Sequence, residues 1–459
     1  MTAAVVAAVG LAVLVVGRAR PLRFAALATW AAGSAVLALS LAPAAHAVLY
    51  AIIAAVGLVA AVALAWLFVR LPWLVVVALL ACAPLRIPVA VGDTHGKLLL
   101  PLYAVVAGAA LALAWQLAFG RGGSHELGAL AWPLALFVVW GGVASIWSDD
   151  RRQGAVYLLC YLLPFALLAV VAARLPWAPG WVGTVYAQLA VTALAFAATG
   201  IWQYGTRDVF WGPRTIADGA HETSSWFYRV SPAFDGASAY GRFLVVAILA
   251  SLVLLLFARG VVPWLALAAV AVTFAGLVPS FSQASYVALG AGIVVALAAL
   301  WQRWSLAALA AAAVVLVGIS IGMPETRHRV LAEADLSAVA GARSTDGVEL
   351  ALQHPLLGVG TGGFRAAKAD ASHDTPITVA AETGVPGLIL LAWLVLAAVF
   401  VCFRRNAVRG PTDRARLAFG LALVALVTHS AFADTLFQDP LFWGALGLAA
   451  VAARAEVPA

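Results

Sequence analysis

The chain has 459 residues, of which 64% are hydrophobic and only 10% are charged, and its formal net charge is +7. Soluble domains carry roughly a quarter of charged residues, so this composition excludes an ordinary soluble protein and predicts a polytopic membrane protein. The arginines lie between hydrophobic segments, as in the cytoplasmic loops of membrane proteins, so the positive charge does not indicate a nucleic-acid partner.

A bilayer core about 30 Å thick is crossed by roughly 20 apolar residues in a helix. The sequence therefore predicts an all-α fold in which about 12–15 spans form one helical bundle, a single membrane domain over residues 1–459. The first segment is apolar from its start, so we expect it to be a span and not a cleaved signal peptide. The predicted spans cover residues 2–17, 24–42, 46–69, 71–84, 97–119, 127–147, 154–173, 181–203, 241–258, 261–279, 284–300, 305–322, 376–400, 417–434 and 438–453, of which the fourth and the last are short.

Two strongly basic loops, 18–23 and 403–416, set the predicted orientation, because cytoplasmic loops are enriched in arginine. The opposite side then carries two long polar loops near 204–240 and 323–375, in which we expect short surface helices and the functional site. One segment conflicts with this rule, since residues 148–154 place two arginines, next to two aspartates, on the outer side.

The first long external loop is rich in arginine and aromatic residues. A guanidinium group presents fixed donors that suit a phosphate, whereas the aromatics are expected as membrane-interface anchors. The segment SFSQAS that follows at 280–285 is typical of a helix N-cap with small packing residues. The arginines that are candidates for holding an anionic ligand are Arg207, Arg214, Arg229 and Arg242.

The second loop contains GVGTGGF at 358–364, with a short amphipathic pattern before it. No Lys-Ser/Thr pair follows the glycines and no strand precedes them, so a nucleotide site is not predicted. We expect a flexible turn that lets the backbone approach a ligand, with Gly360 as the candidate. The three cysteines of the chain show no metal-ligand spacing, so no metal site is predicted.

Two ionisable residues follow the glycines. His373 precedes Pro376 at the expected start of a span, where the positive end of the helix favours the neutral imidazole that a general base needs. A solvated loop histidine fits the spacing equally well. Glu382 lies two turns into the same helix, nominally inside the membrane, where an ionisable residue indicates a functional or paired role.

Four segments resemble the O-antigen ligase and polymerase superfamily of bacterial inner-membrane glycan enzymes. They are YRVSPAFDGASAYGRFL (228–244), SFSQASYVALG (280–290), HPLLGVGTGGF (354–364) and HDTPITVAAETGVPGLIL (373–390), with Arg343 upstream of the last two. The sequence departs from the family pattern at three places. Asp374 replaces an asparagine, Gln283 replaces an arginine, and residues 235–238 read DGAS in place of Asn-Pro-Asn.

The resemblance implies transfer of a glycan from undecaprenyl diphosphate to a hydroxyl of lipid A-core or another envelope glycan, on the outer face of the inner membrane. It implies His373 as the base and Arg343 and Arg229 on the diphosphate, with no nucleotide or other cofactor, independence of metal, and inversion at the anomeric carbon. Further candidates for substrate contact are Arg242, Arg214, Gln283, Glu382 and Gly360.

Three alternatives stay open from the sequence. A polymerase would extend one lipid-linked repeat with another and use the same donor. A transporter or flippase would perform no covalent chemistry, although such proteins usually show repeated halves, and none is visible here. A member that binds lipid-linked glycan without turnover is compatible with Gln283. The acceptor and the oligomeric state are not encoded in any motif.

Overall fold

The structure is a computed structural model. It describes residues 1–41, 47–85, 87–91, 94–120, 126–175, 177, 180–207, 229–232, 234, 236–300, 345–367, 374–404, 408, 410–433 and 436–454.

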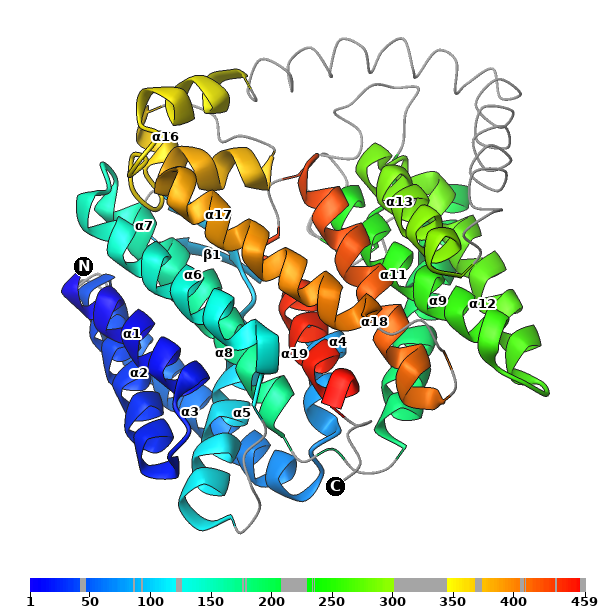
Figure 1. Ribbon diagram of the computed structural model, residues 1–459, viewed down its shortest axis with the longest axis horizontal. Helices are drawn as coiled ribbons and strands as arrows, with labels where there is room; N and C mark the ends of the chain where they lie inside the picture. Colours follow the sequence, from blue (N-terminus) through cyan, green and yellow to red (C-terminus); the bar gives the residue numbers. More distant parts are fainter. Residues whose placement is uncertain are drawn as a thin grey trace.

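The described part of the chain is a bundle of long helices (Figure 1). Nine of the described helices are long and apolar enough to cross a membrane. The long elements are α1 (Thr2–Val16), α2 (Arg20–Leu41), α3 (Ala47–Arg70), α5 (Leu100–Phe119), α6 (Ala131–Ala144), α8 (Leu163–Arg174), α9 (Trp181–Thr206), α11 (Ala237–Phe257), α12 (Val262–Leu277), α13 (Gln283–Leu300), α17 (Thr375–Phe403), α18 (Pro411–Ser430) and α19 (Pro440–Arg454).

Shorter elements complete the bundle. They are α4 (Leu74–Cys82), α7 (Arg151–Tyr157), α16 (Phe364–Ala367), the 3₁₀ turns Gly128–Leu130, Ser145–Trp147 and Val278–Ser280, and the π-turn Leu158–Leu162 that joins α7 to α8. A further helix covers 345–353, where the sequence predicted a short amphipathic helix.

Every predicted span except 305–322, which lies outside the described residues, coincides with a helix, so the polytopic all-α fold is confirmed. Two details differ from the prediction. Helix α4 has 9 residues, about 14 Å at 1.5 Å per residue, so it is too short to cross a bilayer alone. A two-stranded antiparallel hairpin then leads into α5, with β1 (Ile87–Val91) paired to β2 (Thr94–Leu98).

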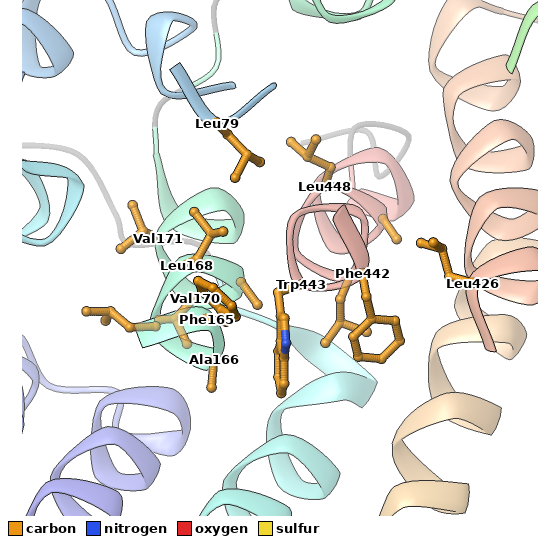
Figure 2. Packing of buried hydrophobic residues seen from close by; sticks show 14 of the residues in the cluster. Leu79, Phe165, Ala166, Leu168, Val170, Val171, Leu426, Phe442, Trp443 and Leu448 are labelled. Atoms are coloured by element: carbon orange, nitrogen blue, oxygen red, sulfur yellow. The ribbon is translucent and has the colours of Figure 1, made fainter. Parts of the chain in front are cut away.

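Helix α8 lies at the centre of the bundle, and every one of its residues is buried. It packs closely on α19, where a Cβ at Gly447 would stand 2.4 Å from the carbonyl oxygen of Ala169. Figure 2 shows Trp443 of α19 between Phe165 of α8 and Phe442. A small residue at a helix crossing is how membrane helices approach each other.

Apolar side chains also cover the outside of the bundle. Leu39, Val48 and Trp264 are each more than 70% exposed. An exposed apolar surface of this extent would be costly in water, and it is the surface expected of a protein whose solvent is lipid.

Arginines close the C-terminal ends of several helices on one side of the bundle. Arg454 at the end of α19 donates a hydrogen bond to Ala173 O of α8 (2.6 Å), and Arg174 at the end of α8 donates to Val15 O of α1 (2.9 Å). These donors satisfy carbonyls that a helix end leaves open, and their charge suits the negative end of the helix dipole. Two more arginines do the same from α2, Arg23 on Gly17 and Arg20 on Gly120.

Candidate active site

Helix α17 is bent at Gly384, whose φ of 69° and ψ of −176° are not helical. Pro386 follows two residues later and has no amide hydrogen to donate to the carbonyl of Glu382, four residues earlier. That carbonyl instead accepts a hydrogen bond from the amide of Gly360 at 2.8 Å. The bend therefore opens the helix to a loop that precedes it in the chain.

A second exchange of hydrogen bonds occurs at the same bend. The amide of Val385 donates to Pro355 O (2.8 Å), and the carbonyl of Ala381 accepts from the amide of Val359 (2.9 Å). The loop 354–364 thus supplies the hydrogen-bond partners that α17 itself lacks at the bend. The backbone carbonyls freed by the helix break therefore stay paired, as a membrane environment requires.

The other side of this loop rests on the end of α6. Thr361 donates its hydroxyl hydrogen to Gly141 O (2.8 Å), and the indole of Trp140 donates to Thr383 O beside the bend (2.8 Å). We call the loop 354–364, held between α6 and the bend of α17, the glycine wedge. Figure 1 shows α6 and α17 side by side, with α7 and α16 at the same end of the bundle.

The glycines of the wedge are required by close contact between backbones. Gly360 has a φ of +89°, and a Cβ there would stand 2.3 Å from Cα of Ser148. Gly362 has a φ of +79° and lies equally close to Gly154 of α7. The surface that these glycines approach is the protein's own 148–154 segment. Contact of the Gly360 backbone with a ligand remains a prediction.

The contact between the glycine wedge and residues 148–154 also concerns the predicted orientation, because this segment places two arginines on the outer side. The amide of Asp149 lies 3.4 Å from Val359 O. The 148–154 segment and the wedge consequently lie on the same side of the bundle, as the predicted topology required.

Glu382 lies two residues before the bend of α17 at Gly384. Residues 385–403 suffice to cross a bilayer by themselves, since about 20 residues are needed. The segment 375–383 precedes the bend, and the position of Glu382 relative to the membrane remains a prediction. Its carboxylate accepts a hydrogen bond from the amide of Phe364 (3.4 Å), so it fixes the start of α16.

The start of α17 is where the sequence predicted it. Asp374 is the N-cap, and its carboxylate accepts a hydrogen bond from the amide of Ile377 (3.3 Å). Burial raises the pKa of the Asp374 carboxyl, and the bond from Ile377 partly opposes this shift. His373 immediately precedes this cap but lies, with Arg343 and Arg214, outside the described residues.

Arg229 is docked on the turn before α13. Its Nε donates to Ser280 O (3.1 Å), and the next residue, Val230, donates its amide to Pro279 O (3.1 Å). Ser282 caps α13 by accepting a hydrogen bond from the amide of Ser285 (3.3 Å), as the N-cap interpretation predicted. Gln283, the first residue of α13, is exposed.

Arg242 has a partner within the protein. Its Nε lies 2.7 Å from a carboxylate oxygen of Asp439, and both side chains are over 90% buried. Beside this pair, His429 of α18 shares a hydrogen bond with the hydroxyl of Ser238 (3.1 Å). This buried ion pair joins α11 to the start of α19. Substrate contact by Arg242 remains a prediction.

The described residues contain no group of three or more His, Cys, Asp or Glu side chains that could hold a metal ion.

A comparison with protein-family models matches residues 268–392 to the O-antigen ligase family. This match supports the resemblance to the O-antigen ligase superfamily that the sequence motifs indicate. A comparison with curated proteins found no significant match.

The O-antigen ligase match begins in α12 and runs through α13 and the glycine wedge to α17 past its bend. It covers about a quarter of the chain and supports a glycan-processing membrane enzyme of the ligase or polymerase type. Arg229 lies before the matched residues, and its contact with Ser280 attaches it to them.

Sequence reasoning missed Asp439 and His429. Both are polar residues at the ends of apolar segments, a position that by itself indicates a paired or functional role. That signal was available in the sequence, but the pairing with Arg242 and Ser238 was not, because the partners are almost two hundred residues away.

Proposed function

We propose that this protein transfers a glycan from undecaprenyl diphosphate to a hydroxyl of an acceptor, lipid A-core or another envelope glycan, at the outer face of the inner membrane. The proposal rests on the O-antigen ligase match together with one contact, the docking of Arg229 on the turn that precedes Gln283.

The contact between Arg229 and Ser280 offers a replacement for the arginine that is missing at position 283. The resemblance expects an arginine where this chain has Gln283, and Ser280, which accepts the hydrogen bond from Arg229, is three residues before it. Arg229 therefore supplies a guanidinium group beside the position that lacks one. Guanidinium groups held in place stabilise the negative charge that develops on a departing diphosphate.

In the proposed reaction the acceptor oxygen bonds to the anomeric carbon as the bond from that carbon to the diphosphate oxygen breaks. His373 removes the proton of the acceptor hydroxyl, and the diphosphate leaves as an anion held by Arg229 and Arg343. Attack opposite the leaving group inverts the anomeric configuration. The reaction draws its energy from the diphosphate, so it requires no nucleotide and no metal.

The glycine wedge supports this role for His373. Phe364, where the wedge ends, is bound to Glu382, and Asp374, next to His373, caps α17. Both ends of the chain segment that contains His373 are thereby attached to the first turns of one helix. The positive end of that helix favours neutral imidazole, the form that accepts a proton. Substrate contact by Gly360, Glu382, Gln283 and Arg214 remains a prediction.

The experiment is transfer by the full-length protein, reconstituted with a lipid-linked glycan and defined acceptors. His373→Ala should lower turnover by about 10²–10⁴-fold, the usual contribution of a general base. His354→Ala is the matched control, because His354 is exposed in the same loop. Unchanged transfer by His373→Ala would remove the histidine from the mechanism.

The diphosphate assignment has its own variants. Arg229→Ala should lower turnover by about 10²–10³-fold and Arg229→Lys should restore part of it, whereas Arg259→Ala, an exposed arginine on the predicted cytoplasmic side, should leave transfer intact. Product analysis separates the alternatives. Glycan on lipid A-core indicates a ligase, and longer glycan on the lipid carrier indicates a polymerase. Flux across vesicles without any covalent product would contradict the proposal.

A further inference from the structure

A cavity of about 680 Å³ lies between the start of α1, the end of α2 and the start of α7. Its volume is within the range of about 300–1,000 Å³ that is usual for ligand sites. One part of its wall is apolar and another is polar and cationic. The lining residues are Met1, Thr2, Leu37, Ser40, Leu41, Arg151, Arg152 and Ala155.

The two arginines of this cavity form no ion pair in the described part of the chain. Arg151 and Arg152 are exposed, and neither forms an ion pair or a side-chain hydrogen bond with any described residue. The neighbouring Asp150 is engaged elsewhere, because its carboxylate accepts the amide of Gln153 (2.9 Å) and caps α7. Two guanidinium groups therefore remain available at the mouth of the cavity.

The position of these arginines is unusual for a membrane protein. Arginine is concentrated in cytoplasmic loops. Helix α7, however, contacts the glycine wedge, and this contact lies on the side of the bundle opposite the helix ends to which Arg174 and Arg454 donate hydrogen bonds. Arg151 and Arg152 belong to the segment 148–154, which conflicts with this rule. Beside them, Leu37 and Leu41 at the end of α2 provide an apolar wall at the membrane boundary.

We propose that this cavity binds a lipid phosphate, that is, a phosphate or diphosphate group carried on an apolar chain. The guanidinium groups of Arg151 and Arg152 hold the phosphate, because their fixed donors match its oxygens. The apolar wall takes the first part of the chain. Either a bilayer phospholipid or a polyprenyl phosphate presents this chemistry.

The cavity is next to the candidate active site but separate from it. Both use α7, since Gly154 of that helix packs against Gly362 of the glycine wedge. Binding at the cavity does not depend on the proposed glycan transfer, so it is tested without an activity assay.

The test is native mass spectrometry of the purified full-length protein with four probes, which are undecaprenyl phosphate, phosphatidylglycerol, undecaprenol and inorganic phosphate. We expect the protein to bind one or both phosphate lipids, and Arg151→Gln/Arg152→Gln to bind them about tenfold more weakly, a conservative figure for the loss of two charge-assisted contacts. The matched control, Arg70→Gln/Arg259→Gln, removes two exposed arginines from the predicted cytoplasmic side.

A second variant tests the cavity without changing its charge. Ser40 is exposed at the cavity wall, so Ser40→Trp should fill the space and weaken lipid binding while both arginines stay. Preference for undecaprenyl phosphate over phosphatidylglycerol would assign the site to a polyprenyl lipid. Equal binding of undecaprenyl phosphate and phosphatidylglycerol would assign it to a bilayer lipid. Equal binding by wild type and the double arginine variant, or binding of undecaprenol as tight as undecaprenyl phosphate, would overturn the proposal.

Discussion

Arg242 and Asp439 illustrate at the residue scale why a charged side chain in an apolar protein need not be a ligand contact. Taking both charges out of water costs several kcal/mol per ion, and their attraction at 2.7 Å offsets much of that cost. The pair contributes little net stability compared with apolar side chains of the same size, but either partner alone would be an unpaired buried charge.

This asymmetry gives a first prediction. Asp439→Asn should lower the free energy of unfolding by about 3–5 kcal/mol, because it leaves Arg242 buried without its counter-charge. Thermal unfolding in detergent measures the effect, with Asp149→Asn at an exposed position as the control. The double variant Arg242→Met/Asp439→Leu should recover most of the loss. A melting temperature of Asp439→Asn equal to that of the wild type would contradict the buried pair.

At the scale of elements, the glycine wedge and the bend of α17 form one unit. Each supplies the hydrogen-bond partners that the other lacks, so neither is stable in this form alone. Gly360 shows the dependence, since its amide pairs with Glu382 O and its α-carbon lies against Ser148.

The second prediction is that Gly360→Ala destabilises this unit. The left-handed conformation costs an alanine about 1–2 kcal/mol. Its Cβ would stand 2.3 Å from Cα of Ser148, so the wedge must move away from the 148–154 segment. Gly290→Ala in α13 is the control, because no atom lies within 4 Å of a Cβ there. Thermal unfolding and the rate of proteolysis within 354–364 are the measurements. A variant that matches the control in both would mean that the wedge is not packed in this way.

The elements also show what a sequence can predict. The spans were found because hydrophobic length is a local property, and the start of α17 because Asp374 and Pro376 are local signals. The packing of the wedge on Ser148 could not be predicted, because glycine spacing is the same whether the backbone approaches a ligand or another part of the chain. The hairpin after α4 was missed since its strands have five residues each, with Pro88 and Gly96 inside them.

At the scale of the whole molecule, two sets of contacts divide the bundle into two sides. Arginine side chains donate hydrogen bonds to the C-terminal carbonyls of α1, α5 and α8 on one side. On the other side, the 148–154 segment meets the glycine wedge. Because arginine is enriched in cytoplasmic loops, the first side is predicted to be cytoplasmic. The glycine wedge is then predicted to face outward, the side on which the proposed reaction takes place.

The third prediction tests this orientation. After replacement of the three native cysteines by alanine, single cysteines are introduced at Asp149, Ala366 and Gly260, all of which are exposed. In intact spheroplasts, a membrane-impermeant maleimide should label the first two variants and not the third, and permeabilisation should expose all three. Different labelling of the first two would contradict the contact between the 148–154 segment and the wedge. The inverse pattern would place His373 in the cytoplasm, and the proposed transfer at the outer face would then be wrong even if the fold is right.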